Sequence, residues 1–325
     1  MNIELPGLFD LQVNGFAGVD FNAPDLTTDR AAESLDRMRA TGVTRCLPTL
    51  ITSSFEQFAA SARLLAGMPH PSIAGIHMEG PYISPEDGAR GAHPRAHVTP
   101  ASRDDFNRRQ DAAGGRIVLV TLAPEVPGAI ALIEHLVATG VRVAIGHTAA
   151  TPPQLAAAIA AGATLATHLG NGCPQMLPRH PNVIWELLAA DAVFASVIVD
   201  GHHLPPATAK AIVRAKGAAK TILVTDAIAA AGCAPGRYTI GGVDCDLGAD
   251  GRVSLPGTPY LAGSSLTLDR AIANTVRFTG LPLDEVIPMA STIPASCVGA
   301  ATAGTVTADW DPDACEFRRL LIADC

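Results

Sequence analysis

Several acidic and imidazole side chains stand at or just after the ends of apolar, strand-like runs of this sequence. Glu79 ends the third run, His147 the fifth, His168 the sixth and Asp226 the eighth, while His202 and His203 follow the seventh. A single His at a strand end is usually a structural residue. A Glu, several His and an Asp at the same ends of successive strands are the residue types that hold a divalent metal or move protons. We therefore expect a metal site or a catalytic site there.

Two amide side chains, Gln12 and Asn14, close the first apolar run, which reads LFDLQVNG. Side chains two apart on a strand point the same way, so both amides share one face. In metal-dependent hydrolases this position would suit a His-x-His pair, and neutral amides are poor zinc ligands beside imidazole. The pair raises the question whether this is a metal enzyme that lacks part of its ligands or a protein with no metal site at all.

The elements that must position these side chains form a repeating pattern. Eight apolar runs occur in order, LFDLQV, TRCLPTLIT, SIAGIHMEG, RIVLVTLAPE, VRVAIGHT, ATLATHLGN, FASVIVDG and TILVTDA. Such runs without strict alternation suit parallel strands buried on both faces. Helical spacing and terminal glycines mark DRAAESLDRMRATG, PGAIALIEHLVATG and PPQLAAAIAAG between them. Strand and helix repeated eight times predict an α/β fold, the (β/α)8 TIM barrel, in which catalytic residues follow the carboxyl ends of the strands.

A doubly wound open sheet is the alternative fold, but it would need a Gly-rich phosphate turn after the first strand, and the sequence has none. The composition narrows the function further. With 31 Asp and Glu against 23 Lys and Arg and no basic run, nucleic acid is not an expected partner. The sequence shows neither a membrane-length apolar stretch nor a signal peptide, so we expect a cytoplasmic protein. Seven scattered cysteines without a C-x-x-C pair speak against disulfides and thiolate zinc sites.

At the strand ends the sequence resembles the N-acetylglucosamine-6-phosphate deacetylases of the amidohydrolase superfamily. The matching stretches are PGLFDLQVNG, GIHMEGPYIS, GAHP, IGHT, THLGNG, DGHH, VTDA and LAGSSLTL, and they run in family order from about residue 6 to residue 300. This resemblance implies an amidohydrolase barrel and removal of an acetyl group from an N-acetylated amino sugar. The expected substrate is N-acetylglucosamine 6-phosphate, which would give glucosamine 6-phosphate and acetate.

The resemblance also implies roles for the residues at the strand ends. Glu79, His147 and His168 would be the metal ligands and Asp226 the catalytic carboxylate, with His93 of GAHP stabilising the developing oxyanion. The loop that carries His93 is longer than the common family form. Three ligands from Glu and His leave an open coordination position, which is the pattern of catalytic zinc. Asp226 would take a proton from the attacking water and return it to the leaving amine.

Several deacetylases of this family carry Gln-x-Asn in the first strand where two-metal relatives have His-x-His. Gln12 and Asn14 therefore predict one divalent ion, zinc before iron, and not two. Both amides, together with His77 on the strand of Glu79, would orient neighbouring groups by hydrogen bonding.

For the substrate, the resemblance implies contacts from Asn171 and Gly172, a phosphate clamp of Arg179 and His203, and further contacts from Ala262 and Gly263. A homodimer is expected, in which the neighbouring subunit can supply the clamp. The loop at 170–182 departs from the family pattern through Gly170, Cys173 and LPRHP. Another N-acyl amine or a cyclic amide is therefore the alternative substrate, and a catalytically silent sugar-phosphate-binding barrel is a third, weaker reading.

Two domains are expected to be unequal. Residues 1–300 would form the barrel, and residues 301–325 would be a short tail left from the small β-sandwich that family members carry. That second domain is thus predicted to be missing or vestigial. One arrangement would pair the tail with YTIGGVDCDLGADGRVS in a small sheet.

Overall fold

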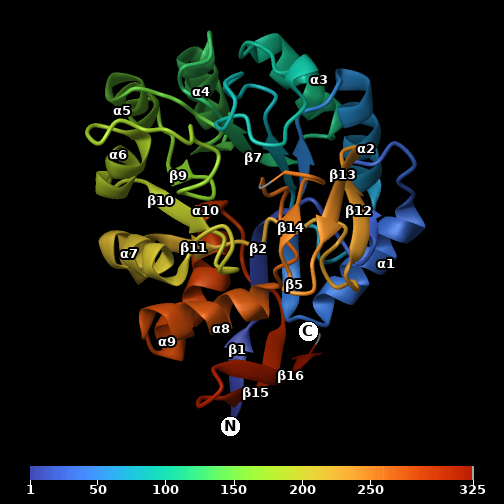
Figure 1. Cartoon of the computed structure of the whole chain (residues 1–325). Coiled ribbons are helices and arrows are strands. Elements are labelled where there is room, and N and C mark those ends of the chain that lie inside the picture. Colours follow the sequence, from blue (N-terminus) through green and yellow to red (C-terminus); the bar gives the residue numbers. More distant parts are fainter. Residues whose placement is uncertain (259, 324–325) are drawn as a thin grey trace.

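The computed structural model describes residues 1–258 and 260–323, and eight parallel strands form its centre (Figure 1). The strands are neighbours in the order β11, β10, β9, β8, β7, β6, β5, β2. Their bounds are β2 Leu8–Val13, β5 Val43–Ile51, β6 Ile76–Glu79, β7 Ile117–Leu122, β8 Arg142–Ile145, β9 Leu165–Ala166, β10 Phe194–Val197 and β11 Thr221–Leu223. All eight predicted strands are present, and the TIM-like barrel fold is confirmed.

The barrel closes between its first and last strands just beyond the end of β11. The Asp226 amide donates to the Gln12 carbonyl at 3.0 Å, and the Asn14 amide donates to the Ala227 carbonyl at 2.7 Å. Val13 and Ala227 form an isolated parallel bridge at the same place. The residues that join the two ends of the sheet are therefore the predicted site residues or their direct neighbours.

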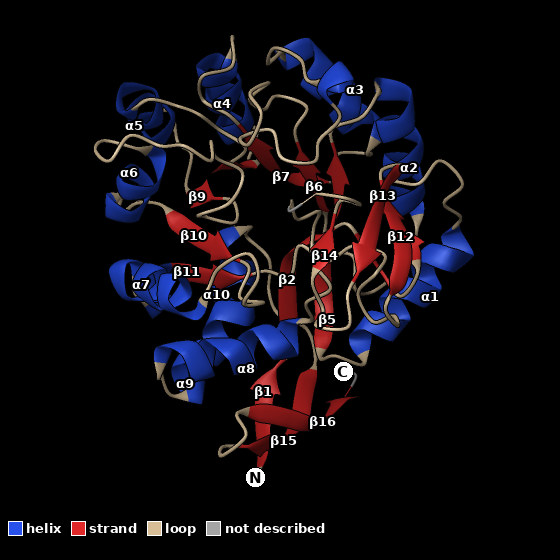
Figure 2. Ribbon diagram, in the orientation of Figure 1, coloured by secondary structure: helices blue, strands red, loops and turns tan. Residues whose placement is uncertain are grey.

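Helices form a ring outside the strands (Figure 2). The eight longer ones are α1 Thr28–Arg39, α2 Phe55–Gly67, α3 Arg103–Ala112, α4 Ala129–Ala138, α5 Pro152–Ala160, α6 Val183–Ala189, α7 Pro206–Lys216 and α8 Leu268–Thr279. The shorter ones are η1 Arg95–His97, η2 Ala218–Lys220, α9 Leu283–Val286, η3 Ile287–Ala290 and α10 Thr292–Cys297. Because helices cover the outer face, strands such as β2 are buried along their whole length.

The three helices expected from the sequence are α1, α4 and α5, and their ends follow from local chemistry. The Thr27 side chain accepts from the Arg30 amide at the start of α1, and Thr151 with Gln154 forms a capping box at the start of α5. Gly140 and Gly162 follow α4 and α5 with positive φ, which a side chain would disfavour.

Two small antiparallel sheets flank the barrel. One contains β1 Asn2–Pro6, β15 Thr305–Asp311 and β16 Glu316–Ala323, in the order β1, β15, β16. The other contains β12 Gly236–Ile240, β13 Val243–Leu247 and β14 Val253–Ser254. A short ribbon of β3 Gly15–Phe16 and β4 Val19–Asp20 follows β2.

The suggested pairing of the tail with residues 236–254 is wrong. The tail pairs with the first residues of the chain, with Asn2 opposite Asp309 and Leu5 opposite Val306. This register places Leu5, Val306 and Trp310 in buried positions, so the pairing removes apolar surface from water. In Figure 1, β1, β15 and β16 lie together outside the helical ring.

Residues 236–254 form their own antiparallel sheet beside the carboxyl ends of the barrel strands. Ile240, Cys245 and Leu247 are buried in one cluster with Ile51, the last residue of β5, and with Ile228, which follows Asp226 closely. This sheet therefore forms one wall of the barrel mouth. Among residues 1–258 and 260–323, none of the helices has both the length and the apolar character needed to cross a lipid bilayer.

Candidate metal and catalytic site

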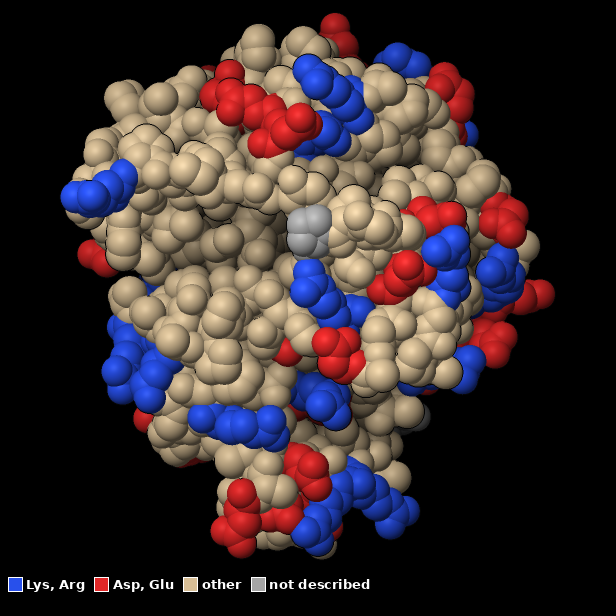
Figure 3. Space-filling model, viewed as in Figure 1, with Lys and Arg blue, Asp and Glu red and all other residues tan. Residues whose placement is uncertain are grey.

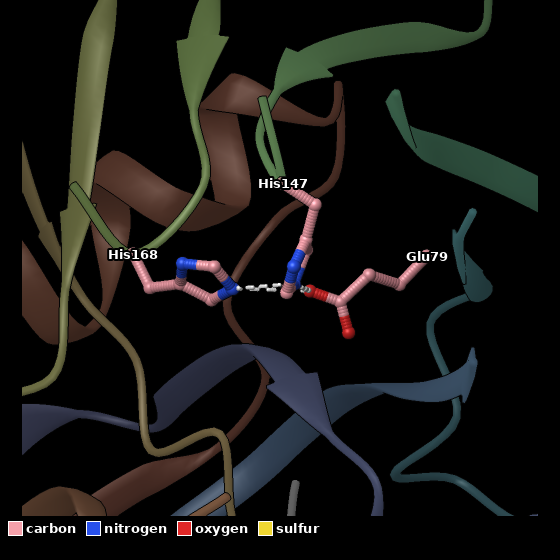
Figure 4. Close-up of side chains that lie close together, drawn as sticks. All are labelled: Glu79, His147 and His168. Carbon is pink, nitrogen blue, oxygen red and sulfur yellow. Dashed lines mark hydrogen bonds and ion pairs between the residues drawn. The ribbon is translucent and has the colours of Figure 1, made fainter. Parts of the chain in front are cut away.

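Glu79, His147 and His168 converge at the carboxyl ends of the barrel strands (Figure 4). Glu79 is the last residue of β6, while His147 and His168 follow β8 and β9. Their ligand atoms lie within 4.8 Å of one another, and all three residues are buried. The Glu79 Oε1 atom is 3.2 Å from Nε2 of each histidine, and the two Nε2 atoms are 3.1 Å apart.

The backbone turns sharply at these positions. His147, His168 and Asp226 have φ values of 50°, 31° and 51°, in the left-handed region that residues with a side chain rarely adopt. Such conformations cost about 1–3 kcal/mol each and persist where the surroundings fix them, often at functional sites. Gly172 packs against the same rings, because a Cβ there would lie 2.9 Å from His168 Cε1.

The hydrogen bonds of His147 show that the cluster fits a cation. Its Nδ1 lies 3.0 Å from the Ala89 carbonyl, which can only accept, so Nδ1 carries the hydrogen. In the neutral ring, Nε2 is then a bare lone pair that faces the Glu79 oxygen and His168 Nε2. Acceptor atoms this close repel unless a positive charge lies between them, so this set suits a divalent metal ion.

When the two histidine rings are protonated, they act on the pKa of Glu79 in the direction expected of a cation. Burial acts to raise the pKa of Glu79, but the hydrogen bonds and charges of His147 and His168 prevail and hold it well below its ordinary range. For His168, burial acts to lower the pKa, and the hydrogen bond and charge of Glu79 outweigh it, so that the pKa rises. The carboxylate is therefore ionised, as a metal ligand must be.

Asp226 lies beside this cluster and is held by the two amides of the first strand. Gln12 Nε2 donates to Asp226 Oδ1 at 3.1 Å and to Glu79 Oε1 at 2.9 Å, and Asn14 Nδ2 donates to Asp226 Oδ1 at 2.7 Å. Burial raises the pKa of Asp226 to about 6, and the charge of Glu79 adds to this. The amides thus fix one carboxylate oxygen and leave Oδ2 for other contacts.

His93 reaches the site from the loop between β6 and α3. Its Nε2 is 3.8 Å from Glu79 Oε2, and its ring meets the His147 ring edge-on with centroids 4.3 Å apart. Burial, with the charge of His147, lowers the pKa of His93 to about 3, so its imidazole is neutral.

His77 lies on β6 but not in the cluster. Its Nδ1 is 3.1 Å from the Leu11 carbonyl and its Nε2 is 2.8 Å from Thr121 Oγ1, so both nitrogens have partners inside the barrel. Burial lowers the pKa of His77 to about 4. These contacts fit the orienting or structural role expected for this residue.

Four predicted substrate-binding residues line the mouth near these groups. Asn171 follows His168, and its buried Nδ2 atom has no hydrogen-bond partner among the described residues. The Gly172 carbonyl accepts from the Thr148 amide at 3.0 Å. Gly263 lies against the Asp226 segment, since a Cβ on Gly263 would come within 3.2 Å of the Asp226 carbonyl. Ala262 is buried in the cluster that contains Ile228.

Among the described residues of one chain, Arg179 and His203, the predicted phosphate clamp, make no contact with each other. Arg179 is exposed on the loop between β9 and α6, and among the described residues its guanidinium has no hydrogen bond or ion pair. His203 instead donates from Nδ1 to Asp200 Oδ2 at 2.6 Å. Its charge is among those that act on the pKa of Asp226, so His203 lies near the site. On the face of the molecule seen in Figure 1, the space-filling surface has a hollow whose visible walls are mainly uncharged (Figure 3).

Comparison with known proteins identifies relatives that align with nearly the whole chain. The amidohydrolase family matches residues 3–317. An N-acetylglucosamine-6-phosphate deacetylase of Lysinibacillus sphaericus is 33% identical over 95% of this chain and 80% of its own length. An N-acetylgalactosamine-6-phosphate deacetylase of Escherichia coli O157:H7 is 35% identical over 90% of this chain and 78% of its own length. This chain belongs to the amidohydrolase family, among its amino-sugar-phosphate deacetylases.

Solved structures of this deacetylase group share the fold closely. The crystal structure of the N-acetylglucosamine-6-phosphate deacetylase from Mycobacterium smegmatis is 32% identical, with a TM-score of 0.90 over 98% of this chain and 86% of that chain. The Thermotoga maritima enzyme is 27% identical, with a TM-score of 0.86 over 99% of this chain and 87% of that chain. The predicted family and its class, a hydrolase of carbon–nitrogen bonds, are confirmed.

Sequence reasoning missed three residues that support this deacetylase site. Thr52 contacts His93, Asp200 contacts His203, and the Ser196 hydroxyl accepts from the His168 amide at 2.8 Å. Thr52 and Asp200 follow the ends of β5 and β10. The signal that found Glu79, a polar side chain at a strand end, could have marked Thr52 and Asp200 as candidates, although it could not have indicated their partners.

We expect one divalent ion per chain. Gln12 and Asn14 direct their amide nitrogens toward carboxylate oxygens. Asn14 Oδ1 is one of the buried side-chain atoms that have no hydrogen-bond partner among the described residues. A single amide oxygen is a weak basis for a second ion. Elemental analysis of protein dialysed against metal-free buffer should give about one equivalent. Two equivalents, or a second ion beside Asn14 in a crystal structure, would contradict this.

Proposed function

We propose that this chain hydrolyses the N-acetyl amide of an amino-sugar 6-phosphate, with N-acetylglucosamine 6-phosphate as the expected substrate. The proposal rests on one observation in the barrel mouth. The buried cluster of Glu79, His147 and His168 lies next to the Asp226 carboxylate and to a neutral His93. The names of the related deacetylases agree with this chemistry.

The metal would be held by Glu79 Oε1 and by Nε2 of His147 and His168. When bound there, a divalent ion supplies Lewis acidity and makes water more acidic. A ligand set of two His and one Glu is a known catalytic zinc set, so zinc is the ion we propose.

Asp226 would act as general base and then as general acid. Gln12 and Asn14 occupy Oδ1, so Oδ2 is the oxygen available to take the proton of the attacking water. The same oxygen would return that proton to the amine nitrogen as the amide bond breaks. His93 would donate from Nε2 to the carbonyl oxygen while negative charge develops on it.

We propose that Arg179 binds the 6-phosphate across a homodimer, because it is exposed on its own chain and has no partner in the part of the chain described. His203 would be the second clamp residue, since it lies near Asp226 with its Nδ1 held by Asp200. A guanidinium gives phosphate two parallel hydrogen bonds, and an imidazole gives one more.

Arg179→Ala is expected to lower kcat/KM for the phosphorylated sugar by about 10- to 100-fold and to leave the unphosphorylated sugar unchanged. An unpaired interfacial charge contact costs about 2–5 kcal/mol when fully buried, and less when water reaches it. Steady-state kinetics on N-acetylglucosamine with and without the phosphate measure this. Arg63→Ala, which removes an exposed arginine of α2, is the matched control.

The same kinetics test the proposed substrate. The galactosamine relative makes N-acetylgalactosamine 6-phosphate the second candidate, so both epimers should be assayed together with simple N-acyl amines. Equal rates on phosphorylated and plain sugars would contradict the clamp. Hydrolysis of neither sugar would show that the altered loop at 170–182 serves a different acyl-amine substrate.

A further inference from the structure

We propose that Thr52 is a positioning residue that holds His93 in the tautomer with its hydrogen on Nε2, opposite to the tautomer of the adjacent His147. The catalytic meaning of this inference rests on the proposed function. The tautomer itself does not, because it follows from hydrogen bonds that can be tested without any substrate.

Thr52 directly follows β5, and its backbone amide and its hydroxyl both lie next to the same ring nitrogen of His93. The Thr52 amide donates to His93 Nδ1 at 3.4 Å, and Thr52 Oγ1 lies 2.9 Å from that atom. A backbone amide can only donate, so Nδ1 must be an acceptor. Since Nδ1 then carries no hydrogen, the neutral ring has its hydrogen on Nε2.

The His147 ring shows the reverse arrangement. Its Nδ1 faces the Ala89 carbonyl, which can only accept, so Nδ1 carries the hydrogen and Nε2 is bare. The two rings are in contact, with centroids 4.3 Å apart at an angle of 63°. One imidazole therefore presents a lone pair to the cluster and its neighbour presents an N–H group.

This difference separates a ligand from a donor. His93 Nε2 is 3.8 Å from Glu79 Oε2, so this nitrogen lies beside the ligand cluster without belonging to it. The contact with Thr52 places a hydrogen on that atom instead. With that hydrogen, His93 Nε2 has no lone pair to offer a metal ion and can donate to the substrate carbonyl oxygen.

The test variants must spare the packing of Thr52. A Cβ on Gly80 would lie 2.2 Å from Thr52 Oγ1, so this side chain fills space next to Glu79. Thr52→Val keeps the shape and removes only the hydroxyl, whereas Thr52→Ser keeps the hydroxyl. Thr44→Val is the matched control, because Thr44 is a buried threonine at the opposite end of the same strand.

The first measurement is 15N NMR of protein with labelled histidine, recorded metal-free and with one equivalent of zinc. In the wild type and in Thr52→Ser we expect His93 to be protonated on Nε2 and bare on Nδ1 in both states. Thr52→Val removes the 2.9 Å hydroxyl contact and keeps only the longer 3.4 Å contact of the backbone amide, so there we expect a mixture of the two tautomers. Protonation on Nδ1 in the wild type, binding of His93 to zinc, or a wild-type tautomer in Thr52→Val would overturn the proposal.

The second measurement is steady-state kinetics. Loss of one oxyanion donor costs about 10²- to 10³-fold in kcat, and a partial shift of tautomer should cost roughly tenfold, with little change in KM. Thr52→Ser and Thr44→Val should keep wild-type kcat. If the Thr52→Val tautomer shifts while kcat does not, the positioning role stands and the role of His93 in the proposed function fails.

Discussion

Asp226→Asn is expected to lower kcat by roughly 10²- to 10⁴-fold while metal content and substrate affinity stay near those of the wild type. The amide oxygen of the new side chain can still accept from Gln12 and Asn14, which hold Oδ1 at 3.1 and 2.7 Å. Only the other oxygen, the one proposed to take the proton, is replaced. The variant therefore separates proton transfer from the geometry of the mouth.

Three measurements on Asp226→Asn are needed together. Elemental analysis and calorimetric titration with the substrate should match the wild type, and only turnover should fall. Asp269→Asn is the control, since Asp269 is a partly buried carboxylate on the outer helix α8. Retention of a tenth of kcat would mean that another group moves the proton, and His203 with its Asp200 partner would be examined next.

Glu79→Gln should abolish tight metal binding and activity together. The carboxylate supplies the negative charge between two imidazoles that lie 3.2 Å away, and a neutral amide is a much poorer ligand for zinc. Metal at 1,000 times its Kd stabilises a wild-type fold by about 4 kcal/mol, because it binds only the native state. We expect added zinc to raise the Tm of the wild type and to leave that of Glu79→Gln unchanged.

A neighbouring carboxylate provides the control for Glu79→Gln. Glu125 follows β7 at the same end of the barrel, where it accepts from the Thr148 hydroxyl at 2.5 Å and from the Ala149 amide at 2.6 Å. It is not part of the ligand cluster, so Glu125→Gln should keep about one zinc per chain. Tight zinc binding by Glu79→Gln would remove Glu79 from the ligand set.

The sequence was most informative where burial and strand geometry act alone. Eight apolar runs with turn residues between them define the barrel, and its topology brings Glu79, His147 and His168 together. Alternation along β2 also placed Gln12 and Asn14 on one face, and both amides do contact Asp226. These features depend on periodicity, which a single sequence displays.

Other features depend on partners that are distant in the sequence. Pairing of β1 with the tail joins residues at opposite ends of the chain, and the sequence of neither segment indicates which strand it will pair with. The contacts of Thr52 with His93 and of Asp200 with His203 depend on loop conformation, which strand spacing does not determine. The role of Arg179 was inferred from family likeness and stays a prediction, since its side chain is exposed in the single chain.

Closure of the barrel through Asp226 has a consequence for the order in which the protein matures on the ribosome. The amides that hold this carboxylate are 214 and 212 residues earlier in the chain. One edge of β2 therefore stays unpaired until β11 has been synthesised. Glu79, His147 and His168 come from β6, β8 and β9, which precede β11 in the chain. The proposed metal ligands are thus synthesised before the proposed base, and we expect hydrolysis only after the first and last strands have met.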